Sequence, residues 1–136
     1  MLVEYVRNES NELETFFEKL DKSNAVDVFR QVIEWQAGYY AKKGEDVVGH
    51  LHAHLILSKH NFMLGYALGK VLGQCIELGR EQSVFSKGAD AQQLGSMFMN
   101  DILSITSFVP WPIDDSNGIK QKIIERSEMY IDMLLA

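Results

Sequence analysis

Residues 45–79 keep one helical phase along their whole length, and this segment constrains the fold more than any other part of the chain. At about 100° per residue, the apolar residues ahead of the Gly65-x-x-x-Gly69-x-x-x-Gly73 repeat fall on the same side as its glycines. A coherent polar face falls on the other side, made of Glu45, His52, Lys59, Lys70, Gln74 and Glu77. The pattern predicts one helix of about 50 Å that forms the centre of a bundle. A break at residues 58–61 is the alternative interpretation.

Four shorter amphipathic helices are predicted from apolar residues at three- and four-residue spacing. Their starts are indicated by side chains that accept hydrogen bonds from the free N–H groups of a first helical turn. Residues 2–6 alternate like a strand, but this run is too short to support a sheet without partners. The expected helices are residues 11–20, the residues from the Ser23-Asn24 cap to Lys43, those from Asp90 to about Pro110, and those from the 114–116 turn to Leu134.

The composition is ordinary for a globular protein. With 136 residues, 46% of them apolar, the chain is long enough for one hydrophobic core and short for two. We therefore expect one all-α domain over residues 1–136, a helical bundle of about five helices with a long central helix. The single cysteine, Cys75, cannot form an intrachain disulfide, and the first residues lack the pattern of a secretory signal. These features predict a cytoplasmic protein.

The charge of the chain bears on its partners. The net charge is −6 and the basic residues are scattered, so no continuous cationic stripe is available to neutralise a phosphate backbone. This argues against nucleic acid as a partner. Polar and charged residues interrupt the apolar runs of residues 45–79, which argues against a membrane span. An acidic surface instead steers basic proteins toward the domain.

The three glycines of the long segment require a close neighbour. Each glycine inside a helix costs about 1 kcal/mol relative to alanine, so three at four-residue spacing indicate the close approach of another backbone. Leu68 and Leu72 lie beside this groove as ridges. One interpretation is a homodimer seam, in which two copies cross at Gly65, Gly69 and Gly73. The other is that the second or fifth helix of the same chain fills the groove.

A second candidate site is a stripe of ionisable residues at four-residue spacing. Asp46, His50 and His54 stack along one side of the predicted helix, and two imidazoles at this spacing can share a divalent metal ion. Glu34 on the preceding helix is the obvious further carboxylate ligand. Histidines in a helical core that bond to carbonyl groups are the competing interpretation. The paired Glu-x-x-His motifs of di-iron bundles are absent from the sequence, and no cofactor is favoured.

Aromatic residues suggest two binding surfaces. Trp35, Tyr39 and Tyr40 cluster late in the second predicted helix, and Trp111 lies between two prolines. Prolines restrict the backbone and so reduce the entropy lost when an indole enters a partner's pocket. The alternative for Trp111 is that it closes one end of the bundle.

These patterns favour a non-enzymatic, acidic, helical protein interaction module of the regulator, inhibitor or immunity type. We expect it to bind another protein and to form a homodimer through its glycine face. The alternative function is a metal-dependent or small-molecule-binding helical enzyme that uses the Asp46, His50 and His54 stripe.

Overall fold

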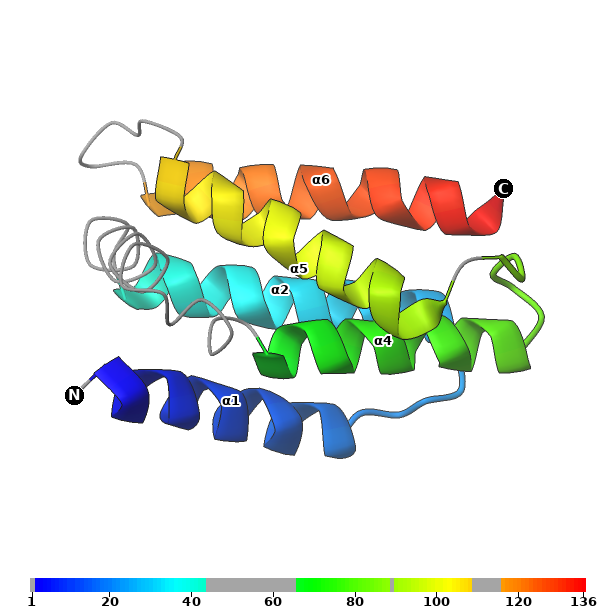
Figure 1. The fold of residues 1–136 in the computed structure, drawn as a ribbon, viewed down its shortest axis with the longest axis horizontal. Coiled ribbons are helices and arrows are strands. Elements are labelled where there is room, and N and C mark those ends of the chain that lie inside the picture. The colour runs from blue at the N-terminus through cyan, green and yellow to red at the C-terminus, as the bar shows by residue number, and fades with distance from the viewer. Residues whose placement is uncertain (1, 44–65, 89, 109–115) are drawn as a thin grey trace.

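The computed structural model describes residues 2–43, 66–88, 90–108 and 116–136. Within these ranges the chain forms helices and no strand, which confirms the prediction of an all-α bundle (Figure 1). None of the described helices carries an apolar stretch long enough to cross a membrane. The helices are α1 (Leu2–Glu18), α2 (Ala25–Lys43), α4 (Tyr66–Glu81), α5 (Ala91–Phe108) and α6 (Ser116–Leu135).

Two of the predicted helix starts are confirmed by their caps. The Asn24 side-chain oxygen accepts hydrogen bonds from the backbone N–H groups two and three residues later, at 3.1 and 3.2 Å. Asp90 does the same at the start of α5, at 2.8 and 3.2 Å. Each cap satisfies N–H groups that have no partner inside the helix. These local bonds explain why α2 and α5 begin where the sequence predicts.

The first helix differs from its prediction. It was expected over residues 11–20, but α1 runs over Leu2–Glu18 and includes the residues that alternate like a strand. An alternating run needs a neighbouring strand to complete its hydrogen bonds, and the described part of the chain offers none. The helix supplies those bonds internally. The long helical segment was predicted to end at residue 79, whereas α4 continues to Glu81.

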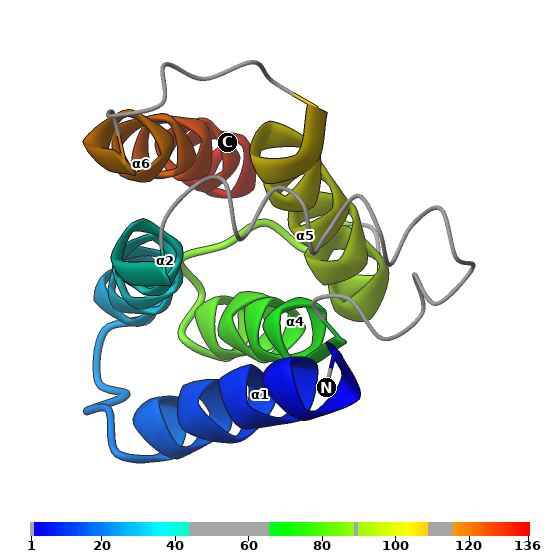
Figure 2. The same ribbon diagram turned by 90° about the vertical axis from the view of Figure 1, so that its left-hand side faces the viewer.

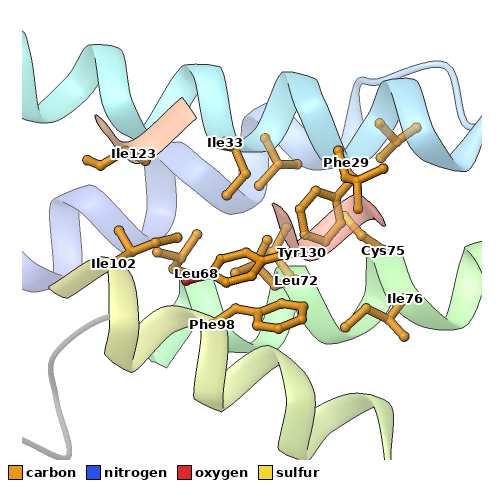
Figure 3. Packing of buried hydrophobic residues seen from close by; sticks show 14 of the residues in the cluster. Phe29, Ile33, Leu68, Leu72, Cys75, Ile76, Phe98, Ile102, Ile123 and Tyr130 are labelled. Carbon is orange, nitrogen blue, oxygen red and sulfur yellow. The ribbon is translucent and has the colours of Figure 1, made fainter. Parts of the chain in front are cut away.

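The helices share one hydrophobic core. α4 packs against α1, α2 and α5, while α2 also packs against α6. Figures 1 and 2 show α1 at one edge of the bundle and α6 at the opposite edge, with α2 and α4 between them. Of the predicted long central helix, α4 is the part that the structure describes. Figure 3 labels core residues of α2 (Phe29 and Ile33), α4 (Leu68, Leu72, Cys75 and Ile76), α5 (Phe98 and Ile102) and α6 (Ile123 and Tyr130).

The glycine face of α4 is occupied by α5 of the same chain. A Cβ atom added to Gly95 of α5 would lie 2.5 Å from the Gly69 carbonyl oxygen and 2.6 Å from the Gly73 nitrogen. The two backbones are therefore in direct contact, as the glycine spacing predicts. The neighbour at Gly69 and Gly73 thus belongs to the same chain, as one of the two interpretations has it. It is the helix predicted from Asp90 to about Pro110, and not the second or the fifth predicted helix, so that part of the prediction is wrong. The homodimer stays a prediction.

The ridge residues of the same prediction are also unavailable to a second copy. Leu68 and Leu72 are buried in the core, with exposed fractions of 1% and 0%. They pack toward the other helices of the bundle, so they stabilise the fold and offer no surface to a partner. Gly65 lies outside the described residues.

The backbone contact between α4 and α5 predicts that replacing glycine by alanine has opposite effects on stability at Gly95 and at Gly38. Gly95→Ala should lower the free energy of unfolding by about 1–3 kcal/mol, because the methyl group has no room between the backbones. Gly38→Ala in α2 is the control, since an added Cβ there meets nothing within 4 Å. It should raise that free energy by up to about 1 kcal/mol through helix propensity. Urea unfolding of both variants measures the difference, and equal effects would contradict the crossing.

Candidate functional site

A groove between α1 and α2, formed by described residues alone, is the candidate site. It consists of two adjoining hollows, with cavity volumes of about 390 and 460 Å³, that share Glu12 and Trp35. Figure 2 shows the two helices that form its walls, with α4 packed between them on one side. The groove is lined by Asn11, Glu12, Thr15, Phe16 and Lys19 of α1 and by Glu34, Trp35, Gly38, Tyr39 and Lys42 of α2.

A row of three aromatic rings crosses this α1–α2 groove. The Phe16 and Trp35 rings stack with centroids 5.9 Å apart, and Trp35 stacks on Tyr39 at 5.2 Å. All three side chains are half-buried, so the row has ring surface open to solvent. Tyr40 meets Tyr39 edge-on from the core side, where it is fully buried. Of the aromatic cluster found in the sequence, Trp35 and Tyr39 therefore line the groove, and Tyr40 belongs to the core.

Gly38 leaves open space beside these rings. It lies inside α2, where glycine costs about 1 kcal/mol relative to alanine. Unlike Gly95, it has no described neighbour within 4 Å of the position of a Cβ atom. Packing within the described chain therefore gives no reason for a glycine here. Its effect is to keep the groove hollow next to Trp35 and Tyr39.

Carboxylates line the groove from both walls. Glu12 of α1 and Glu34 of α2 border the same hollow, and both residues are exposed. Neither takes part in the ion pairs that link described residues. Lys42 borders this hollow as well, and Lys19 borders the adjoining one. The groove thus combines ring surface with charges of both signs that form no ion pair with any described residue.

A buried carboxyl group joins the two helices next to the groove. Glu9 of α1 is only 8% exposed, and Gln36 Nε2 of α2 donates a hydrogen bond of 2.8 Å to its Oε1. Burial raises the pKa of Glu9 to about 7, although hydrogen bonds from Gln36 and Tyr40 lower it, and the charge of Glu12 raises it further. The group therefore titrates near neutral pH.

The surroundings of Gln36 also favour a protonated Glu9. Gln36 is fully buried, and its Oε1 has no hydrogen-bond partner among the described residues. A buried acceptor without a donor is costly. A protonated Glu9 carries an O–H donor beside this amide, and an ionised one does not. The unpaired acceptor and the raised pKa thus point to the same neutral state.

Burial and acidic neighbours both act on the Tyr39 hydroxyl in the groove. The pKa of this hydroxyl is raised to about 12, chiefly by burial and further by the charges of Glu9 and Glu12. The phenol therefore stays neutral at physiological pH. Cys75, by contrast, lies in the core, where burial raises its pKa to about 12, so it remains a thiol at neutral pH.

The predicted metal site is only partly within the described chain. Asp46, His50 and His54 lie outside the described residues, as does Trp111. Glu34, the predicted fourth ligand, lies exposed on the wall of the groove. Within the described ranges, no three His, Cys, Asp or Glu side chains come together to hold a metal ion. The metal site therefore stays a prediction, and the structure places Glu34 in a different setting.

Sequence reasoning identified Trp35 and Tyr39 but missed three members of this site. By sequence alone, Phe16 falls on the apolar face of the helix predicted over residues 11–20, and Glu12 lies at its start, where acidic residues are commonly solvated. Gly38 carried a usable signal, because a glycine inside an otherwise regular helix requires a reason. Phe16, Glu12 and Gly38 line one groove only because of the way α1 packs against α2, which the sequence does not reveal.

Comparisons with known proteins add no functional information. No family model, no curated protein and no solved structure matches the chain. The function is therefore inferred from the geometry of the molecule.

The buried Glu9 predicts that stability falls as pH rises. Its pKa is about 7 in the folded chain and ordinarily 4.5, so the folded state holds the proton more tightly. The contribution of Glu9 to the free energy of unfolding should be greatest below pH 4.5. About 3 kcal/mol of that free energy should be lost between pH 4.5 and pH 7.

Glu9→Gln is the matched control for this pH dependence. It keeps the size and hydrogen-bonding capacity of the side chain without the charge. The variant should be more stable than the wild type at pH 8 and should lack this part of the pH dependence. Urea unfolding between pH 5 and 8 measures both chains, and parallel curves would contradict a proton held by Glu9.

Proposed function

We propose that this chain is a non-enzymatic protein interaction module, of the regulator or inhibitor type, whose α1–α2 groove receives a segment of a partner protein. The observation that carries the proposal is the half-exposed row of Phe16, Trp35 and Tyr39 beside the hollow at Gly38. Aromatic side chains that bury much area at little entropic cost are typical of the centres of protein interfaces.

The shape of the groove suits an inserted side chain. At about 390 Å³, the hollow beside Gly38 exceeds the volume of one side chain. The rings offer apolar contact, and exposed polar residues surround them, which is the arrangement of an interface centre and its rim. A partner that filled the hollow would bury the ring surface now open to solvent.

The charge of the chain supports a basic partner. The net charge of −6 attracts cationic proteins over distances of about 10 Å at moderate salt. Glu12 and Glu34 bring two negative charges to the hollow beside Gly38, against one positive charge from Lys42. The proposal needs no second copy of the chain, because α5 covers Gly69 and Gly73, where the homodimer was expected.

A peptide-display selection tests this function. Random peptides are selected on the wild-type chain, and each binder is then measured on Gly38→Leu, which fills the hollow while improving helix propensity. Groove binders should lose affinity by about tenfold or more, as expected when a central contact is removed. Trp35→Ala should weaken the same peptides.

Asn100→Leu is the control for this selection. Asn100 is an exposed residue of α5, so the substitution adds the same side chain to a helix surface away from the groove. Affinity should remain that of the wild type. Selected peptides that bind Gly38→Leu as tightly as the wild type would refute docking in the groove.

A further inference from the structure

The geometry points to an arginine side chain of the partner as the group that enters the hollow beside Gly38. This inference rests on the proposed docking function and specifies its chemistry. Its basis is the position of Glu12 and Glu34 on opposite walls of one hollow that Trp35 and Tyr39 also line. Two carboxylates and two aromatic rings around one space are the groups that bind a planar cation.

The carboxylates are available for such a cation. Both residues are exposed, and neither is engaged in an ion pair with a described residue. In this they differ from Glu128 of α6, which is held by Arg30 at 2.8 Å. A guanidinium carries five N–H donors in a rigid plane, so it can bond to both walls at once.

The rings favour arginine over lysine. Trp35 and Tyr39 already stack with centroids 5.2 Å apart, and a guanidinium can extend such a stack because it is planar and weakly hydrated. An ammonium group is a compact, strongly hydrated charge that cannot stack in this way. The missing side chain at Gly38 provides the room for the planar group beside the rings.

The charged groups around the hollow have opposing effects. Glu12 acts on Tyr39, where its charge adds to the effect of burial in raising the pKa of the hydroxyl, so a cation is attracted to this position. Lys42 borders the same hollow, and its positive charge repels the guanidinium of an entering arginine. Removing the carboxylates and removing the lysine should therefore shift arginine binding in opposite directions. Apolar stacking alone would respond to neither change.

Nuclear magnetic resonance titration of the full chain tests the inference. The probe is N-acetyl-arginine amide, and the control ligand is the citrulline derivative, which has nearly the same shape without the charge. Arginine should cause saturable shifts at the Trp35 indole N–H and the Gly38 amide. The double variant Glu12→Gln with Glu34→Gln should bind the arginine derivative about threefold to tenfold more weakly, because it loses two exposed ion pairs of ordinary strength. Lys42→Gln should tighten binding.

The outcomes separate this inference from the docking function. Equal binding of the arginine and citrulline derivatives, or no saturable shift at Trp35 and Gly38, would overturn the arginine assignment. If the selected peptides still lose affinity for Gly38→Leu in that case, the docking function stands with a different anchor. Unchanged spectra elsewhere in the exposed glutamate variants show that their fold is intact.

Discussion

The close approach of α4 and α5 is the constraint on which the rest of the structure depends. With backbone atoms in contact at Gly95, Gly69 and Gly73, the position of α5 against α4 admits almost no variation. One face of α4 is used in this way, and Leu68 and Leu72 turn toward the remaining helices, where they are buried. The glycines thus serve the interior of the bundle, which explains why they are tolerated in spite of their low helix propensity.

The attachment of α1 to the bundle is of a different kind. Its central apolar contact, Leu13, is buried, but next to it lie the buried acid Glu9 and the half-exposed rings of Phe16 and Trp35. Apolar residues of the same volume would stabilise such an interface more than a buried carboxyl group does. α1 is therefore held by a contact that titrates near neutral pH, on the side of the molecule that carries the groove.

Three departures from ordinary helix packing meet in this one place. Gly38 lies in a helix where the described residues give no packing reason for a glycine, Glu9 is buried as an acid, and an aromatic row is only half-buried. Each has a cost in stability, and in natural proteins such costs concentrate at functional sites. Their coincidence between α1 and α2 supports a binding role for the groove more strongly than any one of them alone.

The sequence by itself determined the helical class and the starts of α2 and α5, because Asn24 and Asp90 cap them through bonds that reach only two or three residues along the chain. It also determined that the glycine face needs a close neighbour. Only the tertiary structure decided that this neighbour is α5, that α1 begins at Leu2, and that Glu34 meets Glu12 across a groove. Helical periodicity identifies which side chains share a face, whereas the partner of that face depends on how helices distant in sequence cross.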